Sequence, residues 1–245
     1  MSKLSARDAR ERRPAPPFQG ELHEFSYREN TTMTIHQKLI PIARPFFDDA
    51  RGSHGWDHTL RVAALCEEIG RREGADLDVL AAAALLHDIG RRDQDEAKGA
   101  VCHAERSAEL AGPILAGLNG FSPEWRKNVL HCVRTHRFRG KNVPETPEAR
   151  VLFDADKLDA IGAVGVARAY LFAGEIGAAL HSPNVDVTVS SAYSRDDTGY
   201  REYRVKLLGI RDRMLTETGR EMAEERHRFM VAFFDRFLAE VEGKS

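Results

Sequence analysis

Apolar residues recur at intervals of three and four along most of the chain, which is the spacing of one face of an α-helix. The first such segment starts after Thr34, with apolar side chains at Ile35, Leu39 and Phe46. The same spacing predicts further helices over 57–73, 77–88, 103–117, 123–137, 147–173 and 200–240, with a break near Gly219 in the last. The pattern therefore predicts an all-α fold, built as a single helical bundle over residues 33–245.

Two segments depart from this periodicity. Residues 1–32 are rich in charge and proline and carry no sustained apolar repeat, which is typical of a flexible extension. Residues 185–189, with the sequence Val-Asp-Val-Thr-Val, alternate apolar and polar positions and form either the arm of an edge hairpin or a loop. We therefore expect one domain over 33–245, with its main helices over 34–172 and C-terminal helices over 200–240.

The composition indicates a folded protein without disulfide bonds or membrane segments. Of 245 residues, 42% are hydrophobic, enough for a sizeable core, and 36 Lys plus Arg against 38 Asp plus Glu give a net charge of −2. The chain therefore has no overall positive charge of the kind that would indicate a nucleic-acid polymer as a partner. Cys66, Cys102 and Cys132 lack the paired spacing of a zinc finger or a disulfide framework. The longest apolar stretch, 79–86, is far shorter than the roughly 20 residues that span a bilayer, so we expect a cytoplasmic protein that does not enter a membrane.

The most distinctive polar pair lies at the end of an apolar run. Residues 81–86 (Ala-Ala-Ala-Ala-Leu-Leu) belong in a core and lead directly into His87 and Asp88. A buried imidazole next to a buried carboxylate is costly unless something pairs with both. A divalent cation can do so, because both groups are common ligands of zinc, manganese and iron. The alternative for this segment alone is a helix end with a capping histidine and a solvated aspartate.

Two further segments carry polar groups of the same kind in apolar helices. His58 lies at the start of one predicted helix, and Asp154, Asp156 and Asp159 lie within the apolar segment 151–160. Because a helix turns about 100° per residue, Asp156 and Asp159 share a face while Asp154 points elsewhere. One of that pair should bind a metal, and the other should support it or take part in catalysis.

The order of these residues resembles the H…HD…D pattern of the HD-domain phosphohydrolase superfamily, in particular its stand-alone bacterial members. His58 comes first, then His87 and Asp88, and then Asp156. The resemblance covers residues 34–172 and includes the segments Asp-His-x-x-Arg-Val and Leu-Leu-His-Asp-Ile. It implies that these two histidines and two aspartates bind a divalent metal ion within a helical bundle. Nitrogen and oxygen ligands do not select among Mn, Fe, Mg, Co, Ni and Zn.

Three further histidines lie where some branches of this superfamily bind a second metal. For His103 and His136, a second-metal or phosphate-contacting role stands beside the alternative of ordinary packing. His131 fits less well, because it is five residues from His136, about 140° around a helix, and the two cannot face one ion. Arg137 follows His136 and the chain has no Gly-Tyr-Pro sequence, which disfavours the cyclic-dinucleotide branch.

A phosphate group also needs cationic partners. Arg91, directly after the segment His-Asp-Ile-Gly, can bind phosphate oxygens with a bidentate guanidinium. Lys157 is next to one of the candidate ligands and either stabilises the transition state or pairs with a neighbouring carboxylate. The cluster of Arg134, Arg137 and Arg139 is more typical of a solvated helix end.

Together these residues predict a metal-dependent phosphohydrolase. A metal held by two histidines and two aspartates lowers the pKa of bound water and polarises phosphorus. The expected reaction is cleavage of a phosphoester or phosphoanhydride, and the resemblance to the superfamily implies that the substrate is small and nucleotide-like. Asp88 could bridge to a second ion, and Asp159 or Glu105 could accept the proton of the water. Two alternatives stay open: a nucleotide-binding regulatory module with little turnover, and a helical interaction module whose His and Asp residues are structural. A homo-oligomer is also compatible with the sequence.

Overall fold

The computed structural model describes residues 33–48, 52–97, 100–137, 142–183 and 185–244. Every regular element within these ranges is a helix and none is a strand, which confirms the all-α prediction. Residues 185–189 accordingly form a loop, the second of the two alternatives. The flexible extension predicted over 1–32 and Arg139 of the arginine cluster lie outside the described residues.

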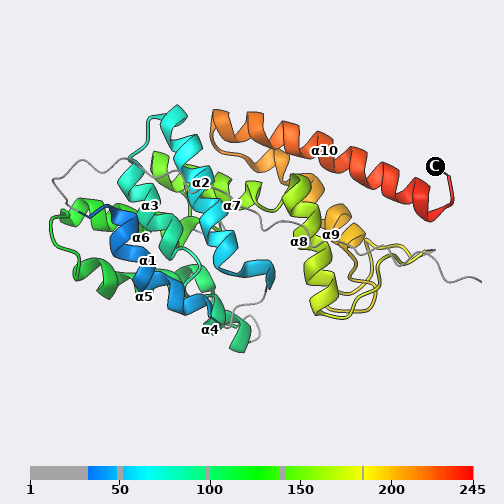
Figure 1. The fold of residues 1–245 in the computed structure, drawn as a ribbon, viewed down its shortest axis with the longest axis horizontal. Coiled ribbons are helices and arrows are strands. Elements are labelled where there is room, and N and C mark those ends of the chain that lie inside the picture. The colour runs from blue at the N-terminus through cyan, green and yellow to red at the C-terminus, as the bar shows by residue number, and fades with distance from the viewer. Residues whose placement is uncertain (1–32, 49–51, 98–99, 138–141, 184, 245) are drawn as a thin grey trace, which may run out of the picture. The chain divides into compact units, whose positions relative to one another are not determined.

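Ten α-helices and four short 3-10 turns make up the described part of the chain (Figure 1). The α-helices are α1 (Ile35–Ala43), α2 (Trp56–Glu73), α3 (Leu77–Leu86), α4 (Arg91–Glu96), α5 (His103–Ala116), α6 (Pro123–Thr135), α7 (Pro147–Leu158), α8 (Gly162–Glu175), α9 (Gly199–Val205) and α10 (Glu217–Val241). The 3-10 turns are η1 (Arg44–Phe47), η2 (Gly52–His54), η3 (Leu207–Gly209) and η4 (Arg211–Arg213). Side-chain oxygens cap the first turns of α1, α3, α6, α7, α9 and α10, which explains where these helices begin.

The structure corrects the sequence prediction at three helices. The single helix predicted over 147–173 is wrong, because the chain breaks at Gly162, whose φ of 77° lies in the left-handed region that glycine adopts readily. The helix predicted over 200–240 has the expected break, but the break lies over 206–216, before Gly219, because α9 ends at Val205 and α10 begins at Glu217. α4 is an additional helix that the periodicity does not predict, because none of its residues is buried.

α3 lies at the centre of the helical bundle. It packs against α2, with which it forms an antiparallel hairpin, and also against α1, α6 and α7. Consistent with this position, every residue from Val79 to Leu86 is buried. α5 and α6 form a second antiparallel hairpin, and α7 packs against both α2 and α6. The end of α3, at His87, therefore lies close to residues of both hairpins.

The connection after α3 lies directly on α5 because residue 90 is a glycine. The Gly90 N–H donates to the Ser107 hydroxyl at 2.9 Å. A Cβ at this position would lie 2.6 Å from the backbone nitrogen of Ser107 and 2.9 Å from the carbonyl carbon of Arg106, too close for any side chain. The absence of a side chain thus lets the segment that carries His87 and Asp88 approach α5.

The first aspartate of α7, Asp154, has a structural role. Its carboxylate accepts hydrogen bonds from the N–H groups of Leu215 and Thr216 at 2.9 and 2.8 Å, and from the Thr216 hydroxyl at 2.6 Å. These contacts hold the segment in front of α10. Asp154 therefore faces α10 and is engaged there, as expected for an aspartate that does not share the face of Asp156 and Asp159.

Candidate metal centre

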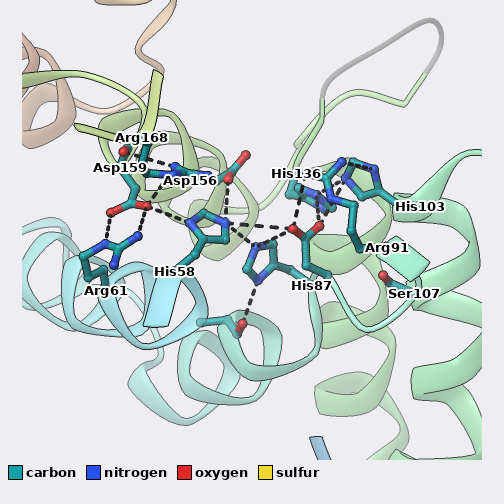
Figure 2. A network of polar contacts seen from close by, with 12 residues as sticks. His58, Arg61, His87, Arg91, His103, Ser107, His136, Asp156, Asp159 and Arg168 are labelled. Atoms are coloured by element: carbon teal, nitrogen blue, oxygen red, sulfur yellow. Dashed lines mark hydrogen bonds and ion pairs between the residues drawn. The ribbon is translucent and has the colours of Figure 1, made fainter. Parts of the chain in front are cut away.

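Two groups of buried His and Asp side chains meet at the end of α3. His58, His87 and Asp88 form the first triad, and Asp88, His103 and His136 form the second. Within each triad one ligand atom per residue lies within 4.8 Å of the others. Figure 2 shows His58 next to His87, with His136 and His103 grouped beyond them. The structure therefore brings five of the predicted site residues into one buried cluster.

Asp159 fixes the ring of His58 in the first turn of α2. The Asp159 carboxylate lies 2.7 Å from His58 Nδ1, so Nδ1 carries a proton and donates it. Burial opposes protonation of the ring, but hydrogen bonds with Asp156 and Asp159 raise the pKa of His58 above its ordinary value. With one proton already on Nδ1, a second proton taken up by the ring would lie on Nε2, the nitrogen that faces the rest of the triad.

The backbone holds His87 in the same tautomer. His87 follows the last residue of α3, and its Nδ1 donates to the carbonyl oxygen of Ala84 at 2.7 Å. Burial lowers the pKa of His87 to about 4, against the attraction of Asp88, so the ring is neutral. Its Nε2 lies 3.4 Å from His58 Nε2. Two lone pairs at that distance repel each other unless a proton or a metal cation lies between them.

A matching pair of histidines belongs to the second triad. His136 follows the last residue of α6, and its Nδ1 donates to the carbonyl oxygen of Val133 at 2.7 Å. His103 is the first residue of α5, and its Nε2 lies 3.1 Å from His136 Nε2. The second triad thus repeats the first, with one histidine held by a carbonyl at a helix C-terminus and one in the first turn of a neighbouring helix.

Asp88 lies between the two triads. Its Oδ2 is 3.8 Å from His87 Nε2 and 3.9 Å from His58 Nε2, and its Oδ1 is 3.2 Å from His103 Nε2 and 3.6 Å from His136 Nε2. Oδ1 is buried and has no well-aligned hydrogen-bond donor among the described residues. Burial favours the neutral acid, but nearby arginine and histidine side chains hold the pKa of Asp88 well below its usual range. A buried, ionised carboxylate among four imidazole nitrogens is a donor set that fits divalent cations.

Asp156 lies beside the first triad. Its Oδ1 is 3.5 Å from His58 Nε2, and its other oxygen pairs with Lys157. Burial favours the neutral acid, but Lys157 and His58 hold the pKa of Asp156 well below its usual range. Lys157 also lies over the ring of Phe153 and reaches the carbonyl oxygen of His136 at 3.4 Å. An ion at His58 Nε2 would therefore have the charged Asp156 carboxylate within reach.

Two arginines outside the predicted site surround Asp159 (Figure 2). Arg61 makes a bidentate contact, with its Nε 2.7 Å from Oδ1 and its Nη2 3.1 Å from Oδ2. Arg168 donates to Oδ2 at 2.8 Å and to the Asp159 carbonyl oxygen at 3.1 Å. Both carboxylate oxygens are therefore engaged next to His58 Nδ1, away from the Nε2 atom that faces the triad. Arg61 lies one helical turn after His58, and that spacing is the sequence signal that could have identified it.

Three other sequence candidates lie apart from the triads. His131 accepts the backbone N–H of Glu145 at 3.0 Å, which fits the packing role that the spacing favours. Glu105 is exposed, and its carboxylate lies 3.5 Å from the side-chain nitrogen of Asn142. Arg134 is exposed at the end of α6, as expected for a solvated helix end.

Arg91 and Arg137 lie close to the second triad. Arg91 Nη1 is 3.0 Å from His103 Nδ1, and its Nη2 is 3.5 Å from Asp88 Oδ2. Arg137 is partly buried and donates to Gln94 Oε1 at 2.9 Å. The solvated position expected for the arginine cluster is therefore wrong for Arg137, because α4 supplies a partly buried acceptor, Gln94, that the sequence pattern does not reveal.

Comparison with known proteins gives the family. The HD domain model matches residues 55–161. YpgQ of Bacillus subtilis, an uncharacterized protein, is 35% identical over 200 residues, which cover 80% of this chain and 88% of YpgQ. The chain belongs to the HD-domain superfamily. The matched residues include His58, His87, Asp88 and Asp156, the H…HD…D pattern of the sequence.

Solved structures of related proteins share the fold of this HD protein. A protein described as a predicted HD superfamily hydrolase, from an uncultured Thermotogales bacterium, has a TM-score of 0.60 at 33% identity and covers 84% of this chain and 93% of its own. YpgQ in complex with ADP has a TM-score of 0.63 at 30% identity over 86% of this chain and 99% of its own. Ribonuclease Y of Pseudothermotoga lettingae is 29% identical over 127 residues, which are 51% of this chain and 22% of that enzyme. The likeness to ribonuclease Y is therefore confined to a segment.

The helices and the cysteines of the HD protein can be compared with what the sequence predicts about membranes and disulfide bonds. Among the described residues, no helix combines the length and the apolar character needed to cross a membrane. Cys66, Cys102 and Cys132 are free, and the first and last of them are buried. The cysteines therefore form no disulfide framework, as their spacing predicts.

Proposed function

We propose that this HD protein is a metal-dependent phosphohydrolase that cleaves a phosphoester or phosphoanhydride bond of a nucleotide with a metal-activated water. The observation that carries the proposal is the pair of buried triads that share Asp88, with imidazole Nε2 atoms facing inwards. The HD domain and the similar HD superfamily hydrolases support the reaction class. The ADP complex of YpgQ supports a nucleotide as the class of substrate.

The first triad together with Asp156 would hold one divalent ion, and the second triad would hold another. Asp88 belongs to both triads and would be the bridging ligand. A bound divalent ion supplies Lewis acidity, which lowers the pKa of a water and polarises a phosphoryl oxygen. Nitrogen and oxygen donors suit Mn, Fe, Co, Ni and Zn as well as Mg, so the identity of the metal is left to experiment.

The cations of the chain would hold the phosphate group. Arg91 and Lys157 have 19% and 18% of their side chains exposed, and each contacts a candidate ligand. Their charges would stabilise the phosphate oxygens as negative charge builds up on the leaving group. For Asp159 we propose the positioning of His58 in place of the proton-accepting role expected from the sequence, because the histidine and two arginines already occupy its carboxylate.

The test is a panel of nucleoside mono-, di- and triphosphates assayed with each of the candidate divalent metals. We expect release of phosphate or pyrophosphate from at least one nucleotide, and activity at background in Asp88→Ala, which loses the shared ligand. Asp95→Ala is the matched control, because Asp95 is an exposed aspartate of α4 and should leave turnover and metal content unchanged. Full activity of Asp88→Ala would contradict the proposal.

The same panel separates the alternatives. Saturable nucleotide binding without product, across all metals, would indicate a regulatory module. Substoichiometric metal, with no loss of thermal stability on chelation, would indicate an interaction module with structural His and Asp residues. A cytoplasmic location and a homo-oligomer stay predictions of the sequence.

A further inference from the structure

His103 has two rival partners at Nδ1, unlike the other three histidines of the triads. Arg91 Nη1 lies 3.0 Å from this nitrogen, and Gln94 Oε1 lies 2.9 Å from it. A guanidinium N–H only donates, so it requires a lone pair on Nδ1. An amide oxygen only accepts, so it requires a proton there. A neutral imidazole cannot satisfy both partners at once.

Gln94 turns its oxygen, and not its NH₂ group, towards His103. Arg137 Nη1 donates to Gln94 Oε1 at 2.9 Å, and the backbone N–H of His103 points to the same oxygen at 3.4 Å. Both are obligate donors, so contacts that do not involve the imidazole already set the orientation of the amide. Gln94 is therefore a preformed acceptor for a proton on Nδ1.

The partner at Nδ1 decides what the other ring nitrogen can do. When Nδ1 accepts from Arg91, the ring proton is on Nε2, which can donate to His136 Nε2 at 3.1 Å and lies 3.2 Å from Asp88 Oδ1. That tautomer cannot bind a metal through Nε2. When Nδ1 donates to Gln94, Nε2 presents a lone pair to the same carboxylate and imidazole, and a cation between them becomes favourable.

We propose that Gln94 is a positioning residue that makes His103 a metal ligand, and that Arg91 holds His103 in the competing tautomer in the metal-free chain. The exchange conserves charge, because one proton leaves Nε2, one is taken up at Nδ1 and the ring stays neutral. It also releases the Arg91 guanidinium, whose Nε is buried without a hydrogen-bond partner among the described residues, to bind a substrate phosphate. Metal binding at the second triad is thereby coupled to phosphate binding, a step that rests on the proposed function.

Nitrogen-15 NMR of the full chain, labelled at histidine, measures the tautomer directly. We expect His103 to carry its proton on Nε2 without metal and on Nδ1 once diamagnetic Zn²⁺ occupies both triads. The His103 signals are assigned as those missing from the spectrum of His103→Gln. A His103 ring that keeps the proton on Nε2 in excess Zn²⁺ would overturn the proposal.

Variants of Gln94 and Arg91 separate this positioning from folding. Gln94→Leu removes the acceptor and should weaken the second Zn²⁺ site about 10- to 100-fold, the usual effect of losing the partner of a ligating histidine. Affinity at the first triad should not change, and Gln94→Glu, which keeps an acceptor, should restore the second site. Arg91→Met removes the rival donor, so it should tighten the second site while raising the KM for the nucleotide. Glu96→Gln is the control, because Glu96 is an exposed residue of the same helix.

Calorimetric titration with Zn²⁺, together with elemental analysis, gives the decisive comparison. Equal second-site affinity in the wild type and Gln94→Leu would overturn the inference, and so would a wild-type chain that binds a single ion. Should Gln94→Leu fail to fold, second-site affinity in Arg91→Met that does not rise would count against the inference equally. In each case the proposed function would survive if turnover persists with the first triad, whereas a wild type that binds no metal and cleaves no nucleotide would contradict both.

Discussion

The two triads that share Asp88 are built alike. In each, a histidine after a helix C-terminus donates Nδ1 to the carbonyl three residues earlier, His87 to Ala84 and His136 to Val133, both at 2.7 Å. In each, the second histidine comes from the first turn of the other helix in the same hairpin. A backbone carbonyl therefore sets the tautomer of one histidine in each triad.

The second histidines of the two triads, His58 and His103, differ in the partner that their Nδ1 atoms contact. His58 donates to Asp159, a carboxylate held in place by two arginines. His103 faces the neutral amide of Gln94 and a rival arginine. A charged acceptor strengthens a ligating imidazole more than a neutral one does. If the proposed function holds, the first triad would be organised before a metal binds, whereas the second would be completed by its metal.

The largest effect should come from truncating the two carbonyl-anchored histidines. His87→Ala removes a ligand of the first triad and should reduce nucleotide hydrolysis to background. His136→Ala should leave the first ion bound, lower the metal content by one ion per chain and retain measurable turnover. His131→Ala, on the same helix as His136 but outside both triads, is the control for each. Turnover and elemental analysis are the measurements, and equal losses in the first two variants would show that the triads do not differ in function.

An intermediate effect should come from replacing Asp159, the residue that positions His58. Asp159→Asn keeps the shape of the side chain but replaces the charged acceptor, so it should weaken the first metal site about 10- to 100-fold. The second site is the internal control, because its histidines do not contact Asp159. Titration of metal-free protein with Zn²⁺ measures both affinities. Equal weakening at the two sites would indicate a general loss of structure and would remove the distinction between the triads.

Helix spacing and local motifs predicted much of the fold and several of the residues that the structure brings together in the triads. The apolar periodicity located most helices, and His58, His87 and Asp88 were recognisable because their polar groups interrupt apolar segments. The break at Gly162 was missed because the apolar positions continue through it. Helical spacing also separated Asp154 from the other aspartates of its segment, as the structure shows.

The residues that hold the side chains around the triads in place could not be predicted in the same way. Arg61 lies 98 residues from Asp159 in the chain, and Arg137 lies 43 residues from Gln94. Such contacts depend on how the hairpins pack, which the spacing of one segment does not specify. The solvated position expected for Arg137 was wrong for this reason, since its acceptor belongs to α4, a helix without an apolar face.

Glu148 joins the two hairpins at the end of α3 away from the triads, and it provides the smallest expected effect. Its carboxylate accepts the N–H of Asp76 and the side-chain amide of Asn128, both at 2.9 Å. Burial favours the neutral acid, but these hydrogen bonds hold the pKa of Glu148 below its ordinary value of 4.5. A carboxylate with a lowered pKa in the folded state stabilises the fold above that ordinary value, and the stabilisation is lost as the pH falls through the lowered pKa.

Glu148→Gln should therefore lower the free energy of unfolding near neutral pH by about 1 kcal/mol, the usual worth of such hydrogen bonds. The difference from the wild type should shrink as the pH falls from 4.5 through the lowered pKa, where the carboxyl of the folded wild type becomes protonated. Urea denaturation of metal-free protein across a pH series measures this, with the exposed Glu109→Gln as control. A difference that grows on acidification would contradict the assignment. Unchanged Zn²⁺ affinities in Glu148→Gln would show that the contrast between the triads arises from the side chains that contact them, and not from the packing that the hairpins share.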